Sequence, residues 1–457
     1  MKKLKQYPNY IDSKVEWLRY LPSHWELVKS KRIFVEASIK GFPDEELLAA
    51  TQTKGVIPKS LYGNTTVTAT KNFETLKLVE KGDFVISLRS FQGGIEYAHY
   101  RGIISPAYTI LKPQDEVVHK YYRYLLKSKR YISGLTLLVT GIREGQNIDT
   151  SKFKDSYLPL PPKQEQTTIA NFLDYKTEKI NRFIQKKKQL IKLLNEQKAA
   201  IINQAVTKGL DANVKMKDSG IDWLGVIPEH WEVRKLKYVA NCFPSNVDKH
   251  SKENEKEVRL CNYTDVYKND FITNDMKLMI ATAKDDQIEK FALKRGDVII
   301  TKDSETADDI ANPAFVIEDL ENVICGYHLS IMRPYSKLKG EYLLRALQCK
   351  PINVQFELCS NGVTRVGLGV ADMKKAEIPL PPLDEQISIS KFIKTETQKI
   401  YKTISTIQKE ITLVEEYKTA LIAEAVTGKI DVRDFKMPRL REEDGDSYRK
   451  LMTAIDK

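Results

Sequence analysis

Residues 158–166 read LPLPPKQEQ, and residues 378–386 read IPLPPLDEQ, so one short element occurs twice, 220 residues apart. Two further matches keep the same order around it. DSKVEWLRYLPSHWELVK at 12–29 returns as DSGIDWLGVIPEHWEVRK at 218–235, and AVTKGLD at 205–211 returns as AVTGKID at 425–431. Chance does not produce three matches in one order, so the chain holds two copies of one unit. Two similar halves suggest a target that also has two similar halves.

A long helix is predicted after each of the paired prolines, which stop the preceding strand and are tolerated in a first helical turn. In both helices, apolar residues recur every 3.5 positions, which is the pattern of a coiled-coil seam. Gly209 and Gly428 stand where a helix would end. The two seams consist of Leu173, Thr177, Ile180, Ile184, Lys187, Ile191, Leu194, Lys198, Ile201 and Ala205, and of Ile393, Thr397, Ile400, Ile404, Ile407, Ile411, Val414, Lys418, Leu421 and Ala425. Their shared register favours helices that pair with each other over helices that pack only on their own domains.

Helix length constrains the target. A helix of about 45 residues is about 68 Å long, and two turns of B-DNA measure about 68–72 Å. An antiparallel pair of such helices would hold two domains two turns apart on one side of a duplex. The predicted target is therefore a split DNA site, two short words separated by unread base pairs. Pseudo-symmetry also predicts that the second helix returns to the segment 12–29, so the chain ends should lie close together.

The globular parts contain short β-like runs and turns. KGDFVISLRS (81–90) and RGDVIITKDS (295–304) each place a Gly-Asp turn before a strand. IISPAYTILKP (103–113) and VICGYHLSIMRP (323–334) are predicted strands ending at proline, and helices are predicted within 121–132 and 341–350. The predicted fold class is α+β: two α/β globular domains separated by two long antiparallel coiled-coil helices with pseudo-two-fold symmetry. The predicted boundaries are 1–162 and 210–382 for the domains, 163–209 and 383–428 for the helices, and 429–457 for a tail.

The net charge of +12 points toward a polyanion such as nucleic acid. The excess belongs to the first copy. Residues 1–162 hold 25 Lys and Arg against 16 Asp and Glu, net +9, whereas residues 209–382 hold 24 against 27, net −3. All five cysteines fall in the second copy without a CxxC pair, so we expect a reduced chain and no metal site. With no long apolar run and no apolar signal core at the start, we expect a cytoplasmic protein without a membrane partner.

Catalytic motifs are missing. No G-x-x-x-x-G-K-[ST] sequence is present to bind a nucleotide triphosphate. Asn312-Pro313-Ala314-Phe315 resembles the N-P-P-[YF] motif of amino-methyltransferases but lacks its middle proline, so a turn before a strand is the better interpretation. The acidic residues within 285–290 have the spacing of a solvated helix face rather than of a nuclease site, and His24 and His230 are expected to be structural.

DNA contacts are predicted in polar loops at equivalent places in the two copies, because arginine on guanine is the commonest specific contact and lysine, serine and threonine contact phosphates. One pair of loops follows the strands within 81–90 and 295–304, and another pair precedes the two proline elements. Glycines in these loops would allow the protein backbone to come close to the DNA. The candidates are Arg89, Ser90, Gln92, Gly93, Arg143, Gln146, Lys302, Ser304, Thr306, Thr364 and Arg365, with Asp303 and Gly94 beside them and Lys54, Lys71, Tyr263 and Lys284 as weaker candidates. A solvated surface loop is the alternative for each residue taken alone.

The duplicated W-L…P-x-H-W-E, P-L-P-P-x-x-E-Q and A-V-T segments resemble the specificity subunit of type I restriction-modification systems over about residues 12–435. The resemblance implies two target recognition domains, each for one half of a bipartite DNA sequence. It implies helices that act as spacer and as docking surface for two methylase subunits. It also implies a chain without catalysis or cofactor, with S-adenosylmethionine on the methylase subunits and with ATP and Mg expected on partner subunits, among them a restriction and motor subunit. Individual base contacts do not carry over, because recognition domains of this family vary greatly.

Two other functions are also compatible with the sequence. One is a complete restriction or modifying enzyme, which would have to methylate DNA alone. The other is a coiled-coil scaffold whose globular ends bind proteins. Binding to DNA that weakens steeply with salt would separate a phosphate-binding protein from the scaffold.

Overall fold

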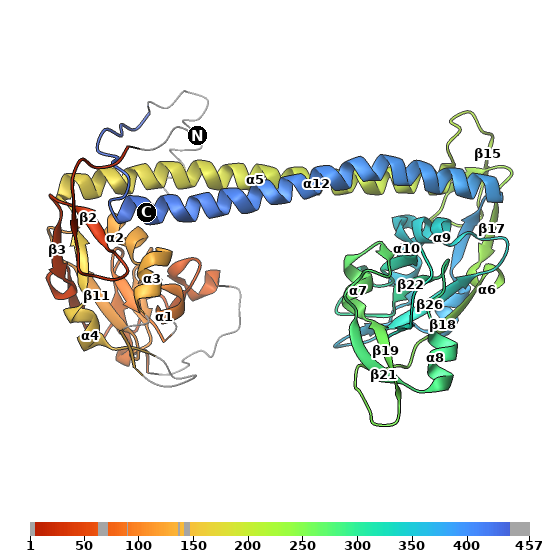
Figure 1. Ribbon diagram of the computed structural model, residues 1–457, viewed down its shortest axis with the longest axis horizontal. Coiled ribbons are helices and arrows are strands. Elements are labelled where there is room, and N and C mark those ends of the chain that lie inside the picture. The colour runs from red at the N-terminus through yellow and green to blue at the C-terminus, as the bar shows by residue number, and fades with distance from the viewer. Residues whose placement is uncertain (1–4, 63–71, 89, 136–137, 141–146, 439–457) are drawn as a thin grey trace. The chain divides into compact units, whose positions relative to one another are not determined.

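The computed structural model describes residues 5–62, 72–88, 90–135, 138–140 and 147–438. It divides into two compact units. Unit 1 comprises Met1–Lys187 with Lys409–Lys457, and unit 2 comprises Lys188–Gln408. The division therefore crosses both long helices, so that each unit holds one globular domain and half of each helix (Figure 1).

Unit 1 is built on a four-stranded antiparallel sheet in the order β4-β11-β8-β9. Its strands are β4 (Phe34–Ala37), β8 (Phe84–Ile86), β9 (Glu96–Tyr97) and β11 (Thr109–Pro113). The Gly-Asp turn before 84 and the strand ending at Pro113 confirm the sequence prediction. The small elements around the sheet are β5 (Leu48–Thr51), β6 (Gly55–Pro58), β7 (Lys77–Val79), β10 (Gly102–Ile104), β12 (Val139–Thr140), β13 (Asn147–Ile148), α1 (Ser90–Gly93) and α4 (Thr150–Asp155).

The helical stretch predicted within 121–132 is two helices, α2 (His119–Leu125) and α3 (Lys129–Leu135). Between them, the Ser128 hydroxyl donates to the Leu125 carbonyl at 2.7 Å, which satisfies a carbonyl of the last turn of α2. Buried Tyr121 and Tyr122 of α2 pack with Phe34 and Phe84 of the sheet in the main core of the unit. The core of unit 1 is therefore strongly aromatic.

The two larger sheets described in unit 2 have the strand orders β18-β26-β22-β24-β20 and β21-β19-β25. The first has β18 (Ala240–Pro244), β20 (Phe271–Ile272), β22 (Val298–Thr301), β24 (Pro313–Val316) and β26 (Leu329–Pro334). The second has β19 (Lys256–Cys261), β21 (Met279–Ala283) and β25 (Val323–Cys325). The helices are α6 (Leu236–Val239), α7 (Tyr263–Lys268), α8 (Asp285–Phe291), α9 (Gly340–Gln348), α10 (Lys350–Cys359) and α11 (Val370–Lys375). The three-stranded sheet shares a second core with the five-stranded sheet, and it has no three-stranded counterpart among the described residues of unit 1.

The repeated segments form the same two ladders in each unit. In unit 1, β1 (Tyr10–Asp12) pairs with β2 (Tyr20–Pro22), and β3 (Glu26–Lys29) pairs with β14 (Tyr157–Leu160). In unit 2, β15 (Met216–Asp218) pairs with β16 (Val226–Pro228), and β17 (Glu232–Lys235) pairs with β28 (Glu377–Leu380). Strands β14 and β28 end at the paired prolines and lead directly into the long helices. The duplication seen in the sequence is thus a duplication of structure.

The long helices are α5 (Lys163–Lys208) and α12 (Leu383–Val426), which lie within the predicted helical segments. In unit 1 they lie antiparallel, with Lys418 Nζ donating to Asn181 Oδ1 at 2.7 Å; in unit 2, Lys198 Nζ donates to the Tyr401 hydroxyl at 3.2 Å (Figure 1). Every predicted seam position is buried or half-buried, so the pairing is confirmed. The helices also join the domain cores through residues such as Leu173 and Ile393.

Lys187 breaks the correspondence between the two seams, and its ammonium lies 2.7 Å from Glu410 of α12. An ion pair across the helices thus stands at the position where the other seam has buried Ile407.

The segment 430–435 brings the described chain ends together within unit 1. The Asp431 amide donates to the Lys5 carbonyl at 2.7 Å, and Lys5 Nζ lies 3.2 Å from Asp434. The Phe435 ring packs edge-on against Phe172 of α5 with centroids 5.2 Å apart. The predicted proximity of the chain ends is confirmed for these residues.

Within the described ranges, no helix is both long and apolar enough to cross a membrane. The same part of the chain contains no group of three or more His, Cys, Asp or Glu side chains placed to hold a metal ion.

Candidate nucleic-acid interface

The repeated His-Trp pair and the repeated glutamate form one buried contact at the start of α5. Glu165 accepts hydrogen bonds from Trp25 Nε1 at 3.0 Å and from His24 Nε2 at 2.8 Å, and a third from the Tyr7 hydroxyl. The Glu165 side chain is only 6% exposed. Burial next to this carboxylate raises the Tyr7 pKa well above its usual range. Glu165 therefore fixes the first turn of α5 to the strands at the beginning of the chain.

The second copy repeats this contact with greater exposure. Glu385 accepts from Trp231 Nε1 at 2.7 Å and from His230 Nε2 at 2.5 Å, and its side chain is 40% exposed. The predicted structural role of His24 and His230 is thus confirmed. We refer to Trp25, His24 and Glu165, with their counterparts Trp231, His230 and Glu385, as the Trp-His-Glu contact.

The glutamine that follows each glutamate links the long helix to the globular domain. Gln166 Oε1 accepts from the Val118 amide at 2.9 Å, just before α2, and Gln386 Oε1 accepts from the Lys339 amide at 2.9 Å, just before α9. Each glutamine also donates to the carbonyl of the first residue of the Pro-Pro pair in its own motif, Pro161 or Pro381, at 2.8 Å. The repeated P-L-P-P-x-x-E-Q element is therefore explained as a joint between helix and domain.

Each domain also contacts the helices through a charged network of its own. In unit 1, Arg123 pairs with Asp174 of α5, and the Tyr124 hydroxyl donates to the same carboxylate at 2.5 Å. In unit 2, the Tyr401 hydroxyl of α12 donates to Asp270, and the fully buried Arg345 lies 3.6 Å from that carboxylate. The two networks use unrelated positions, so the copies reach similar docking by different chemistry.

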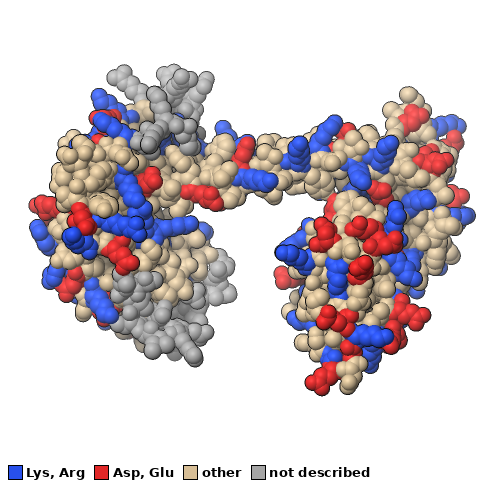
Figure 2. All heavy atoms as spheres, in the orientation of Figure 1, with Lys and Arg blue, Asp and Glu red and all other residues tan. Residues whose placement is uncertain are grey.

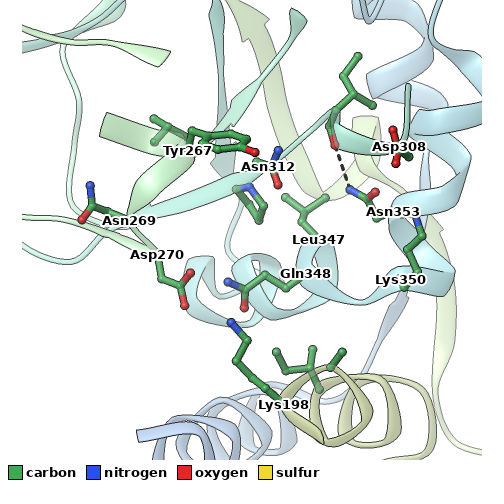
Figure 3. A pocket seen from close by; sticks show the side chains of 15 residues that line it. Lys198, Tyr267, Asn269, Asp270, Asp308, Asn312, Leu347, Gln348, Lys350 and Asn353 are labelled. Carbon is green, nitrogen blue, oxygen red and sulfur yellow. Dashed lines mark hydrogen bonds between the residues drawn. The ribbon is translucent and has the colours of Figure 1, made fainter. Parts of the chain in front are cut away.

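A cavity of about 290 Å³ lies beside the network of unit 2 (Figure 3). Lys198 of α5 extends from below toward Asp270 and Gln348, while Asn312 and Asn353 lie on the opposite side. Asn312 accounts for the methyltransferase-like motif: its side chain donates to the Asp309 carbonyl at 3.0 Å, and the strand β24 begins at Pro313. The interpretation of this segment as a turn before a strand is confirmed.

The loop after β8 in unit 1 forms the short helix α1. Ser90 is buried, and its hydroxyl accepts from the Ser87 amide at 2.8 Å, so this candidate supports the loop from inside. Gln92 is exposed. Gly93 lies so close to Gln52 that an added Cβ would be 2.9 Å from the Gln52 Cγ. Arg89 lies outside the described residues.

Lys127 joins α1 to the β5–β6 turn. Its ammonium donates to the Gly93 carbonyl at 2.6 Å, to the Gln52 carbonyl at 2.8 Å and to Glu96 at 2.9 Å. Glu96 is buried, and this burial raises its pKa to about 7 against the opposing effect of Lys127. Lys54, an exposed candidate, lies in the same turn. One ion pair, between half-buried Lys127 and buried Glu96, thus holds two candidate loops together.

The other candidate loop of unit 1 lies between β12 and β13, and Arg143 and Gln146 fall outside the described residues, as does Lys71. Strand β13 itself contacts α1. The structure therefore brings the base of this loop next to the loop that follows β8.

In unit 2 the two candidate loops form a ladder with each other. Strand β23 (Asp303–Ser304) pairs with β27 (Val366–Gly367), and the Leu368 amide donates to the Lys302 carbonyl at 2.8 Å. Ser304 is buried like Ser90, whereas Thr306, Thr364 and Arg365 are exposed. Two loops that are far apart in sequence therefore present one surface.

Two residues of this surface were missed by the sequence analysis. Tyr327 is 50% exposed, and the Lys302 ammonium lies 4.4 Å from its ring centroid. His328 Nδ1 lies 2.8 Å from Asp303 Oδ2. The signal was the polar Gly-Tyr-His turn inside 323–334, a stretch that was interpreted only as a strand.

The weaker candidates of the second copy stand on other elements. Tyr263 begins α7 and stacks on Tyr267, with centroids 5.6 Å apart, and Lys284 immediately precedes α8. The acidic residues of α8 are exposed, which confirms the interpretation of 285–290 as a solvated helix face. Figure 2 shows acidic and basic side chains mixed over the visible face of unit 2, in line with the negative net charge counted for residues 209–382.

Two copies of one helix-supported domain, each with a cluster of polar loops, define a duplicated binding protein. A family model described as the type I restriction modification DNA specificity domain matches residues 22–193 and again residues 228–413. The chain belongs to this family of type I restriction-modification specificity subunits, which are DNA-recognition subunits rather than catalytic ones.

Relatives cover most of the chain. The type I restriction enzyme MjaVIII specificity subunit of Methanocaldococcus jannaschii is 24% identical over 370 residues, which are 78% of this chain and 81% of the relative. The EcoBI specificity subunit of Escherichia coli is 21% identical over 330 residues, 69% of this chain and 67% of the relative. A solved chain from work on complex assembly and conformational transition of the type I R-M system superposes with a TM-score of 0.65. At 14% identity, covering 90% of this chain and 99% of that one, it shows a shared fold.

Proposed function

We propose that each globular domain binds one half of a bipartite DNA sequence and that the paired helices set the spacing between the halves. The observation that carries this proposal is a repeated joint with unrepeated loops. The Trp-His-Glu contact and the glutamine joint recur in both copies, whereas the loops at 89–93 and 302–306 differ in sequence and in support. Two domains that share the same joint but carry different loops suit a protein that recognises two different short DNA sequences.

The same proposal assigns partners and cofactors. Double-stranded DNA is the target, and two methylase subunits dock on the helices. A restriction and motor subunit completes the complex. Exposed apolar side chains on the helices, among them Phe183, Leu193 and Leu413, support docking, because water-exposed apolar residues on a helix pair suit a protein partner. We propose no cofactor for this chain itself; S-adenosylmethionine, ATP and Mg belong to its partners.

Methylation mapping tests the function directly. Genomic DNA from cells that express the chain with its methylase subunits is compared with DNA from cells that lack only this chain. A new bipartite methylated motif, two words about two helical turns apart or less, is the expected result. A demonstrated complex that methylates no new motif would contradict the proposal and favour a scaffold.

Salt dependence supplies an independent test with purified complex. A protein that neutralises several phosphates loses affinity steeply between about 50 and 200 mM salt. The expected result is a strongly negative slope of affinity against salt concentration on any duplex, with tighter binding to the mapped motif. A slope near zero would contradict contact with the DNA backbone.

A further inference from the structure

Lys302, Asp303, Tyr327 and His328 form a compact cluster on the surface of unit 2. The Lys302 amide donates to the His328 carbonyl at 3.0 Å, so the two segments are joined through their backbones as well as their side chains. The Tyr327 and His328 rings meet edge to face with centroids 5.0 Å apart. Each of the two rings therefore holds one charged side chain, Tyr327 the ammonium of Lys302 and His328 the carboxylate of Asp303.

The cluster is open to solvent. Side-chain exposure is 43% for His328 and 25% for Asp303, and Tyr327 is half exposed. A side-chain contact this exposed contributes little to folding stability, typically below about 1 kcal/mol. The arrangement does fix a donor and an acceptor side by side on a rigid base, because the β23–β27 ladder holds the backbone beneath them.

We propose that Lys302 and Asp303 read one C·G base pair of the second half-site in the major groove, with Tyr327 and His328 as positioning residues. This proposal rests on the proposed DNA-binding function. A C·G pair presents the O6 and N7 acceptors of guanine next to the N4 amino group of cytosine. Lysine donates to the former and aspartate accepts from the latter, so an adjacent lysine and aspartate match both bases of one pair.

The first copy supports a role that is specific to one half-site. Ser90 and Ser304 are equivalent, since both follow the Gly-Asp strand at the same spacing and both are buried. Counting back from these serines, Asp303 corresponds to Arg89 and Lys302 to Leu88. A structural pair belonging to the shared architecture would recur in both copies. Opposite charges at equivalent positions instead fit two loops that read different bases.

The substitution Asp303→Asn tests base recognition without removing the hydrogen bond that supports the loop. The asparagine carbonyl can still accept from His328 Nδ1, so the loop keeps its support. Its amide, however, adds a donor, and asparagine pairs with adenine rather than cytosine. The full chain carrying Asp303→Asn is expressed with its methylase subunits, and the methylated motif is mapped as for the wild type. Asp286→Asn, on the exposed face of α8, is the matched control.

The expected result is a change at one position of the second half-site, where preference for cytosine falls about tenfold and adenine becomes acceptable, as for loss of one base-specific contact. The first half-site and the Asp286→Asn motif stay unchanged. An unchanged motif, or weaker methylation at every site alike with a normal melting temperature, would overturn the assignment. A wild-type complex that methylates no motif would refute the proposed function, and this assignment with it.

Discussion

In the first domain, an ion pair between half-buried Lys127 and buried Glu96 holds the β5–β6 turn and α1 in place, whereas the second domain has Leu347 and Ala314 at the corresponding positions. The correspondence follows from the structure. Tyr122 and Tyr342 donate to equivalent proline carbonyls, which places Lys127 opposite Leu347, and the registers of β8–β9 and β22–β24 place Glu96 opposite Ala314. Two buried apolar residues thus occupy the positions that the ion pair occupies in the first domain.

The comparison shows which features the shared architecture needs. It needs the Trp-His-Glu contact and the glutamine joint, because these recur. It does not need a particular way of holding the loops, because the first domain uses an ammonium bonded to two loop carbonyls and the second uses the β23–β27 ladder. The contacts that hold the loops can therefore differ between two domains that recognise different DNA sequences.

Removing the ammonium should have the largest effect. In Lys127→Leu, the buried Glu96 carboxyl group loses its partner, and leaving a buried polar group unpaired typically costs about 1–3 kcal/mol, and more when the group is charged. Denaturant unfolding measures the loss of folding stability, and limited proteolysis shows which unit unfolds. The loss should be confined to unit 1. The double variant Lys127→Leu with Glu96→Ala copies the second domain and should recover most of the stability. A double variant as unstable as the single one would show that the domains are not interchangeable here.

A pH dependence should distinguish the two domains next. Burial raises the Glu96 pKa from its ordinary value near 4.5 to about 7, so the folded chain holds this proton more tightly than the unfolded chain. The stability of the wild type relative to the double variant should therefore fall as the pH rises from about 4.5 to about 7, by up to about 3 kcal/mol.

Unfolding of unit 1 at pH 5 and at pH 8 checks this difference. His99, whose pKa burial lowers to about 4, acts in the opposite direction but is present in both proteins. A constant difference between wild type and double variant across this range would contradict the role of Glu96.

The Trp-His-Glu contact should matter more in the first copy. Glu165→Ala leaves buried donors of Trp25 and Tyr7 without an acceptor, which should cost about 2–3 kcal/mol. Glu385→Ala should cost about 1 kcal/mol, because water can reach this half-exposed site. Melting curves followed by tryptophan fluorescence compare the two variants. Equal losses would mean that burial does not govern this contact.

Substitution of a single arginine should have the smallest effect. Each substitution should weaken binding to one half-site and leave the other unchanged. Arg365→Ala should weaken binding to the second half-site by about 1–2 kcal/mol, and Arg143→Ala should do the same at the first. Competition between duplexes altered in one half-site measures this. Equal weakening on unrelated DNA would mark these arginines as phosphate contacts.

Much of the architecture was predictable because it is periodic or repeated. The seam positions followed from a 3.5-residue spacing, and Lys187 was visible as the exception, although its partner Glu410 was not. The candidate site was less predictable. Ser90 and Ser304 look like solvent-exposed loop residues in the sequence, yet both are buried, and Tyr327 becomes visible only when β23 and β27 meet. Side-chain direction in loops depends on contacts between distant segments, which a local pattern does not record.

The segment 430–435 has a consequence for synthesis on the ribosome. The core that contains Tyr7 and Trp25 also contains Val426, Ile430 and Val432, so the domain that emerges first is the last to be completed. Unit 2 is continuous from Lys188 to Gln408 and needs no later residue. Domains usually fold in the order of their emergence. Here we expect chains released after residue 408 to protect unit 2 from protease while Trp25 remains accessible, so that the order of folding reverses the order of translation.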